Sequence, residues 1–141
     1  MNSETAPWTV AESEHDGVPV LFRFRQDEGI QLDRRIYPHH LNIIWQCADV
    51  GASQMPTSDE NERMRIFEDR LVQATGYDEQ SILAGVLTGK GKREFIFQAR
   101  DPKVFTRSLT EMPQEVERYP IEIHYYEDPT WDYFDRVTKN L

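Results

Sequence analysis

The sequence predicts an α+β domain built on one antiparallel sheet with two helices on one face. Three observations lead to this class. From residue 40 to residue 127 the expected elements run strand, helix, strand, strand, helix, strand. Two further alternating stretches precede them and are expected to extend the sheet. A chain of 141 residues makes about one domain with a sizeable core, so we expect a single domain over 1–141.

The N-terminal part is expected to supply two strands. Residues 1–6 are small and polar, so we expect them to fray, and residues 7–10 (PWTV) predict a short strand. Over 18–26, valine and phenylalanine alternate with a set that includes Arg23 and Arg25. This alternation is typical of a strand with one face in the core.

The middle of the chain predicts a strand followed by the best helix. Over 40–48, apolar side chains alternate, so adjacent His39 and His40 should point to opposite faces. Thr57 and Glu60 have capping-box spacing at the start of the helix, and Gly76 is a suitable end. The helical face repeats at steps of three and four through Met64, Phe67, Leu71 and Ala74.

The C-terminal half predicts a hairpin, a helix, a strand and a last short helix. Residues 81–88 and 92–99 flank Gly89-Lys90-Gly91, which resembles a hairpin turn more than a phosphate loop, because a strand follows it. Asp101 and Pro102 are a good cap and first position for a helix that Pro113 limits.

A strand over 119–127 precedes a helix expected to open at Asp128-Pro129 and to dock by Trp131 and Phe134. The order over 40–127 is the split βαβ pattern of ferredoxin-like folds, with 128–141 as a C-terminal helix and tail.

Composition excludes several classes of protein. One cysteine, Cys47, can form neither an internal disulfide nor a multi-cysteine zinc site. The net charge of −9 argues against binding of nucleic acid. Apolar runs are too short for a membrane span and the start has no signal pattern, so we expect a soluble, cytoplasmic protein without a membrane partner.

The sequence contains no residue pattern that is diagnostic of a catalytic site or of a metal site. The four histidines lack metal-ligand spacing, and Cys47 shares a face with apolar side chains, as a buried hydrophobe does. We therefore expect no catalytic residue, no metal and no cofactor.

The acidic excess lies in the two ends of the chain. The first 16 residues hold four acids and no base, and the last 31 hold eight acids and three bases. The last segment also interleaves aromatic and acidic side chains, which suit a protein interface. The predicted partner-binding residues are Tyr126, Glu127, Asp128, Trp131, Asp132, Tyr133 and Asp135.

Three functional hypotheses follow. The leading one is a non-enzymatic protein-binding domain, of the immunity or antitoxin type, that inhibits a basic bacterial toxin or nuclease. The second is a small enzyme or ligand-binding domain with a cleft on the open sheet face, lined by Arg23, Arg25, His40 and His124. The third is a regulatory subunit that forms homodimers through an exposed edge strand.

The landmarks together resemble the bacterial domain-of-unknown-function family 695 over most of the chain. They are Trp8, Asp16-Gly17-x-Pro19, Tyr37-Pro38 with Leu41 to Trp45, Met55-Pro56, Glu68-Asp69, Thr88-Gly89, Arg93-Glu94-Phe95 with Phe97, and Asp128-Pro129-x-Trp131 with Tyr133-Phe134. The resemblance implies a ferredoxin-like α/β sandwich and supplies no catalytic residues. By analogy of fold alone, the chain is similar to the regulators of ribonuclease activity B, acidic proteins that bind and inhibit a nuclease.

Overall fold

The structure is a computed structural model that describes residues 8–25, 34–112 and 119–139. Within these ranges the chain forms six strands, three α-helices and one short 3-10 helix. In chain order these are β1 Trp8–His15, β2 Val18–Arg25, β3 His39–Gln46, α2 Ser58–Thr75, η2 Tyr77–Glu79, β4 Ser81–Gly89, β5 Lys92–Ala99, α3 Pro102–Glu111, β6 Ile121–Glu127 and α4 Asp132–Lys139.

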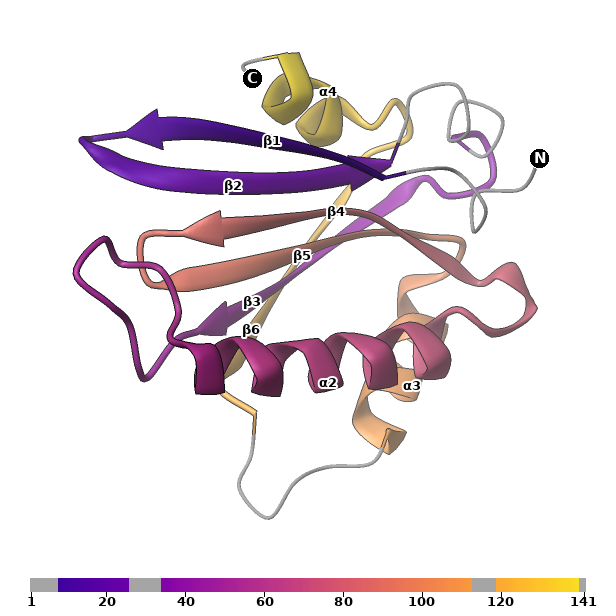
Figure 1. The fold of residues 1–141 in the computed structure, drawn as a ribbon. Helices are drawn as coiled ribbons and strands as arrows, with labels where there is room; N and C mark the ends of the chain where they lie inside the picture. The colour runs from indigo at the N-terminus through magenta and orange to yellow at the C-terminus, as the bar shows by residue number, and fades with distance from the viewer. Residues whose placement is uncertain (1–7, 26–33, 113–118, 140–141) are drawn as a thin grey trace.

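All six strands belong to one antiparallel sheet with the order β1-β2-β4-β5-β3-β6 (Figure 1). The segment from β3 to β6 supplies the four strands β4-β5-β3-β6, and the N-terminal hairpin extends this sheet beyond β4. The predicted α+β class and the predicted extension by N-terminal strands are therefore confirmed. The sheet has β1 at one edge and β6 at the other.

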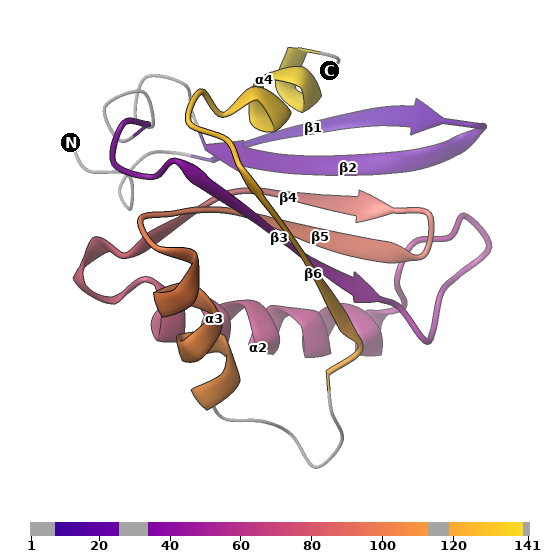
Figure 2. The same ribbon diagram turned by 180° about the vertical axis from the view of Figure 1, so that it is seen from behind.

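Two cores lie on opposite faces of the sheet. Helices α2 and α3 cover one face, whereas α4 lies on the other (Figures 1 and 2). The larger core joins alternate residues of β3 and β5 to the apolar stripe of α2 and includes Leu41, Trp45, Met64, Phe67, Leu71, Phe95, Phe97 and Phe105. The smaller one, under α4, consists of Tyr37, Ile82, Ala84, Trp131 and Phe134, with Phe24 packed against it.

Local signals in the sequence set several element boundaries. Thr57 caps α2 by accepting from the Glu60 amide, and Asp101 caps α3 by accepting from the Lys103 amide. The β4–β5 turn has positive φ at both central residues, Lys90 (54°) and Gly91 (77°). This conformation matches the twist of a two-residue hairpin, so the hairpin-turn interpretation is confirmed.

The two largest differences from the sequence prediction concern β1 and the last helix, while β3 (His39–Gln46) and β6 (Ile121–Glu127) differ from the predicted 40–48 and 119–127 by one or two residues at their ends. Strand β1 runs beyond Val10 to His15, because it pairs with β2 along its whole length. The last helix begins at Asp132 rather than at Asp128-Pro129. The reason is that the Asp128 carboxylate accepts from the Asp132 amide (2.8 Å), while Trp131 adopts φ 58°, which is incompatible with a helix.

Candidate functional site

Strand β6 is the most exposed regular element of the described chain. It pairs with β3 from Ile121 to Glu127 without a register shift, and no described strand lies on its other side. Its last six residues are exposed, including the large side chains of Ile123 (44%), Tyr125 (47%) and Tyr126 (44%). An edge strand presents unpaired N–H and C=O groups to which another strand can bond.

Two histidines of β3 hold the two tyrosines of β6. His39 Nδ1 lies 2.9 Å from the Tyr125 hydroxyl, and the two rings stack. His40 stacks on Tyr126 from the other face of the sheet, with ring centroids 4.8 Å apart. The prediction that His39 and His40 point to opposite faces is confirmed, and each orients one exposed aromatic side chain.

A layer of buried polar side chains lies on the α4 face of β3 and β5. His40, Asn42, Glu94 and Gln98 are all at most 8% exposed. They occupy this face because they alternate with the apolar residues that pack against α2. Buried polar groups cost free energy unless they are hydrogen-bonded, so the bonds within this layer fix its geometry.

The bonds of Gln98 determine the protonation of His40. Gln98 Nε2 donates to the carbonyl oxygens of Tyr37 (3.0 Å) and Asp128 (3.3 Å). Gln98 Oε1 is therefore the acceptor for His40 Nδ1, at 3.1 Å. His40 carries its proton on Nδ1 in this arrangement, and its buried Nε2 has no hydrogen-bond partner among the described residues.

Burial lowers the pKa of His40, and this makes stability depend on pH. Gln98, Asp128 and Glu94 oppose the shift without reversing it. The unfolded chain then binds more protons than the folded one once the pH falls below the ordinary histidine value. The contribution of neutral His40 to the free energy of unfolding is therefore fully present above that pH, and it is lost as the pH falls toward the lowered pKa.

We therefore expect the urea midpoint of the wild-type chain to decline more steeply between pH 7 and pH 5 than that of His40→Gln. The control is His124→Gln, which changes an exposed histidine of β6 and should keep the wild-type slope. If the urea midpoint declines equally with pH in all three proteins, the lowered pKa of His40 is contradicted. Urea titrations monitored by circular dichroism at several pH values provide the measurement.

A second pair of bonds in the polar layer converges on Glu94. Asn42 Nδ2 donates to Glu94 Oε1 at 2.8 Å, and the Tyr133 hydroxyl lies 3.4 Å from the same oxygen. Burial and the Glu94 charge raise the pKa of Tyr133, so its hydroxyl keeps its proton at neutral pH and donates. The layer thus connects α4 to the centre of the sheet.

The predicted partner-binding residues divide into exposed and structural ones. Tyr126, Glu127 and Asp132 are exposed. Trp131 is fully buried and donates Nε1–H to the Tyr37 carbonyl at 2.9 Å. Asp128 is 8% exposed and caps α4.

The remaining two residues also belong to the docking of α4. Asp135 forms two hydrogen bonds with the Arg34 guanidinium, at 2.7 and 2.9 Å, which lower its pKa. Tyr133 lies half-buried against His40. The segment therefore fixes α4 and leaves part of its acidic and aromatic surface for a partner.

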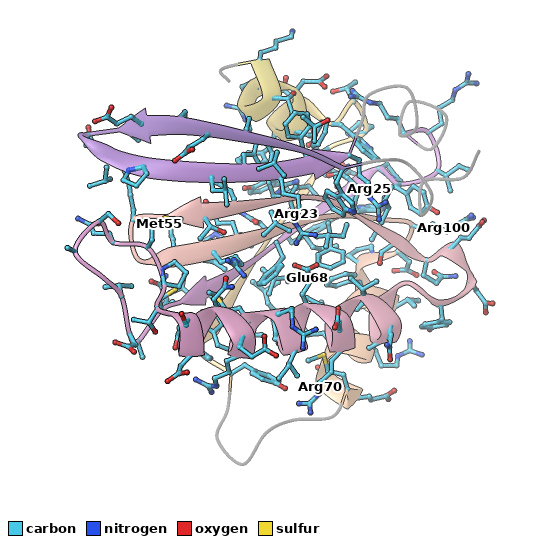
Figure 3. The ribbon with its side chains drawn as sticks, in the orientation of Figure 1. Arg23, Arg25, Met55, Glu68, Arg70 and Arg100 are labelled. Carbon is cyan, nitrogen blue, oxygen red and sulfur yellow. The ribbon has the colours of Figure 1, made fainter. Side chains whose placement is uncertain are left out.

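Arg23 and Arg25 do not share a cleft with His40 and His124. Both arginines point to the α2 side of the sheet, where Arg23 pairs with Glu68 and Arg25 donates to the Leu83 carbonyl (Figure 3). Both guanidinium groups lie against the Trp8 ring, 4.6 and 4.3 Å from its centroid.

The register of β2 explains this placement. Pairing with β4 directs Phe24 toward Phe134 of α4, so the arginines that alternate with it face α2. Helix α4 and Trp131 also cover one end of the face on which the cleft was expected. The structure therefore does not bring the four residues together.

The two acidic ends meet no common surface in the described sheet. Glu12 and Glu14 lie on β1, whereas Glu122 and Glu127 lie on β6 at the opposite edge. The glutamates of the two edge strands therefore do not form one surface.

The surroundings of Cys47 disfavour a reactive thiolate. Cys47 Sγ lies 4.0 Å from Met64 Sδ, and burial raises the pKa of the thiol. Among the described residues, no group of three or more histidine, cysteine or acidic side chains could hold a metal ion. No helix in these ranges is long and apolar enough to cross a membrane.

The sequence prediction missed Asn42, Glu94 and Gln98 as candidate site residues. The signal that could have found them is their position in strands: each alternates with a core residue and so lies on the second face of a central strand. A polar side chain there is buried once another element covers that face, and α4 provides the cover.

Comparison with known proteins gives one match. The comparisons with the curated proteins and with the solved structures each found no match. The model of a family of unknown function, DUF695, matches residues 6–136, which is most of the chain and agrees with the resemblance noted in the sequence. The chain therefore belongs to the DUF695 family.

Proposed function

We propose that this chain is a non-enzymatic protein-binding domain that captures a basic partner along the edge of β6. The observation that carries the proposal is the exposed, regular edge of β6, with Ile123, Tyr125 and Tyr126 interleaved with Glu122 and Glu127. An extended partner segment can add a strand to such an edge through main-chain hydrogen bonds, and its side chains then give specificity.

Charge supports a basic partner rather than a second copy of the chain. The net charge is −9, and both ends of β6 carry a glutamate. Two such edges would bring like charges together, whereas lysine and arginine on a partner would complement them. A basic toxin or nuclease is the partner class that we propose, because an inhibitor of such a protein needs an acidic surface that associates fast and selectively.

The test reverses the charge of this edge and compares it with a matched change at the other edge. In Glu122→Lys/Glu127→Lys and in Glu12→Lys/Glu14→Lys, two exposed glutamates of an edge strand become lysines, so net charge changes equally. We expect the wild-type chain to retain a basic host protein at low salt and to release it at high salt. The β6 variant should retain at least about tenfold less, and the β1 variant should retain it fully.

Three outcomes would contradict the proposal. Equal retention by the β6 variant would exclude this edge, and equal loss in both variants would show a general charge effect. Size-exclusion chromatography with light scattering tests the homodimer hypothesis. A stable dimer of the wild-type chain that dissociates in the β6 variant would mean that a second copy occupies the edge.

A further inference from the structure

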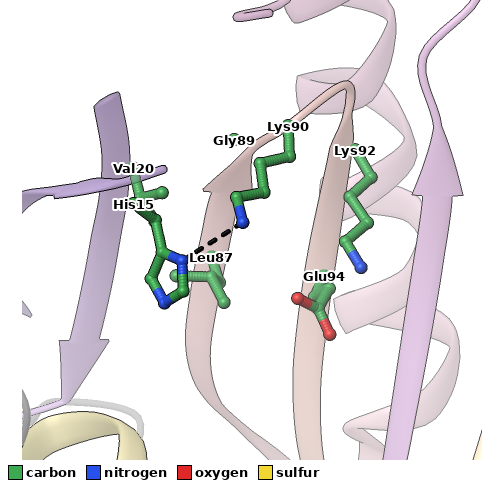
Figure 4. A pocket seen from close by; sticks show the side chains of 7 residues that line it. All are labelled: His15, Val20, Leu87, Gly89, Lys90, Lys92 and Glu94. Carbon is green, nitrogen blue, oxygen red and sulfur yellow. Dashed lines mark hydrogen bonds between the residues drawn. The ribbon is translucent and has the colours of Figure 1, made fainter. Parts of the chain in front are cut away.

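A hollow of about 280 Å³ opens on the α4 face of the sheet, on the far side of β3 from β6 (Figure 4). It lies between the β1–β2 and β4–β5 turns and is lined by His15, Val20, Leu87, Gly89, Lys90, Lys92 and Glu94. Glu94 joins it to the buried polar layer. The hollow lies apart from the edge of β6, and it shares with the docking of α4 the residue Glu94, which the Tyr133 hydroxyl contacts.

Two opposite charges line this hollow without pairing. Lys92 and Glu94 are two residues apart on β5 and so share a face, yet no ion pair joins them. Neither has an ion-pair partner elsewhere in the described chain. Lys90 differs, since its ammonium donates to Asp16 Oδ2 at 2.8 Å and lies 3.1 Å from His15 Nδ1. Lys92 is therefore the lysine whose charge a ligand can use.

The carboxylate of Glu94 is held in place and still has acceptor capacity. It is 8% exposed, and the hydrogen bonds from Asn42 and Tyr133 both reach Oε1. Neutral donors alone compensate a buried carboxylate poorly, so a cationic group beside it would be stabilised. Asn42, which is 3% exposed, adds a second buried acceptor in this layer, because its Oδ1 has no hydrogen-bond partner among the described residues.

We propose that this hollow binds a small zwitterion of the amino-acid type. Its ammonium group lies on Glu94, its carboxylate on Lys92, and its side chain against the apolar wall of Val20 and Leu87. This ligand satisfies both unpaired charges at once, whereas a simple cation would meet Lys92 and a simple anion would meet Glu94. The site is independent of the protein-binding function proposed for β6.

The test uses norleucine together with the two compounds that each lack one of its charges. Pentylamine lacks the carboxylate, and hexanoate lacks the ammonium group. We follow each titration by the backbone amide signals of the isotope-labelled full chain. Norleucine should shift the signals of the hollow with a dissociation constant on the order of 1 mM, as expected for a ligand of this size. Each single-charge compound should bind at least about tenfold more weakly.

Variants assign the binding to the two charges. Glu94→Gln keeps an acceptor for Asn42, and Lys92→Gln keeps a polar side chain, and each should weaken norleucine binding about tenfold or more. Glu122→Gln on β6 and Lys103→Gln on α3 make the same exchanges away from the hollow and should leave it unchanged.

Two results would contradict the proposed zwitterion site. No saturable shift with norleucine would overturn the proposal. Equal binding of pentylamine that survives Lys92→Gln would replace the zwitterion with a simple cation. Because the titration contains no protein partner, either result leaves the proposal for β6 untouched.

Discussion

Replacing Trp131 with alanine is expected to lower the free energy of unfolding by about 3–5 kcal/mol, the range for a large buried aromatic side chain. Trp131 is fully buried between Phe134 and the sheet residues Ile82 and Ala84. Its loss leaves a cavity under α4. It also leaves the Tyr37 carbonyl without the indole N–H that it now accepts, which adds the cost of an unpaired buried group.

Urea denaturation followed by far-ultraviolet circular dichroism gives this value without relying on tryptophan fluorescence. Trp131→Phe keeps most of the ring area and loses only the N–H donor. Its free energy of unfolding should therefore fall clearly less than that of Trp131→Ala. Tyr77→Ala removes an aromatic side chain that is 49% exposed and serves as the control. A loss below about 1 kcal/mol in the alanine variant would mean that α4 is not an integral part of the fold.

Two acids of the C-terminal segment are poorly suited for testing partner binding, because they stabilise α4. Asp128 caps α4 and Asp135 pairs with Arg34, so changing either one disturbs the element that Trp131 anchors. A binding defect in such a variant would report on folding as well as on recognition. The glutamates of β6 and Asp132 are exposed, and the ion pairs of Glu122 with His124 and of Asp132 with Arg136 lie at the surface, so these acids are better suited for measuring recognition.

Local patterns in the sequence predicted the elements well. Period-two alternation identified both faces of β3 and β5, and the helical stripe through Met64, Phe67 and Leu71 identified the buried side of α2. Caps and turns were predictable for the same reason, since Thr57, Asp101 and the turn after Gly89 act on backbone groups within a few residues. These signals do not depend on which elements pack across the sheet.

The candidate site was predicted less well because it depends on contacts between distant residues. Which face of β2 meets α2 is decided by its pairing with β4, about sixty residues away, and this pairing sends Arg23 to Glu68. Asn42 meets Glu94 across 52 residues. Alternation shows that a strand has two faces, but it does not show which neighbour covers each of them.

Glu60 shows how a distant contact can replace a local one. Its spacing from Thr57 predicts a capping box in which its side chain returns to the Thr57 amide. The structure confirms the bond from the Glu60 amide to Thr57 but places the carboxylate elsewhere. Glu60 Oε1 accepts from the Trp45 indole N–H at 2.9 Å and from the Ala48 amide at 3.1 Å. The side chain thus ties the start of α2 to the end of β3.

Replacing Glu60 with alanine is therefore expected to lower the free energy of unfolding by about 2–5 kcal/mol, because two donors lose a charged acceptor. Glu60 is 6% exposed, so water does not readily take its place. Glu60→Gln keeps an acceptor oxygen and should lose less than half as much. Glu62→Ala, an exposed acid of the same helix turn, should stay within about 0.5 kcal/mol of the wild type.

Urea denaturation of these three variants separates the two roles of Glu60. A capping box alone predicts a loss of about 1 kcal/mol and no change around Trp45. The tie to β3 predicts the larger loss and a shift of the Trp45 indole N–H signal in the nuclear magnetic resonance spectrum of Glu60→Ala. A small loss with an unmoved indole signal would assign Glu60 to the helix end alone. A large loss with a moved signal would mean that α2 holds in place the strand that carries His40 and Asn42.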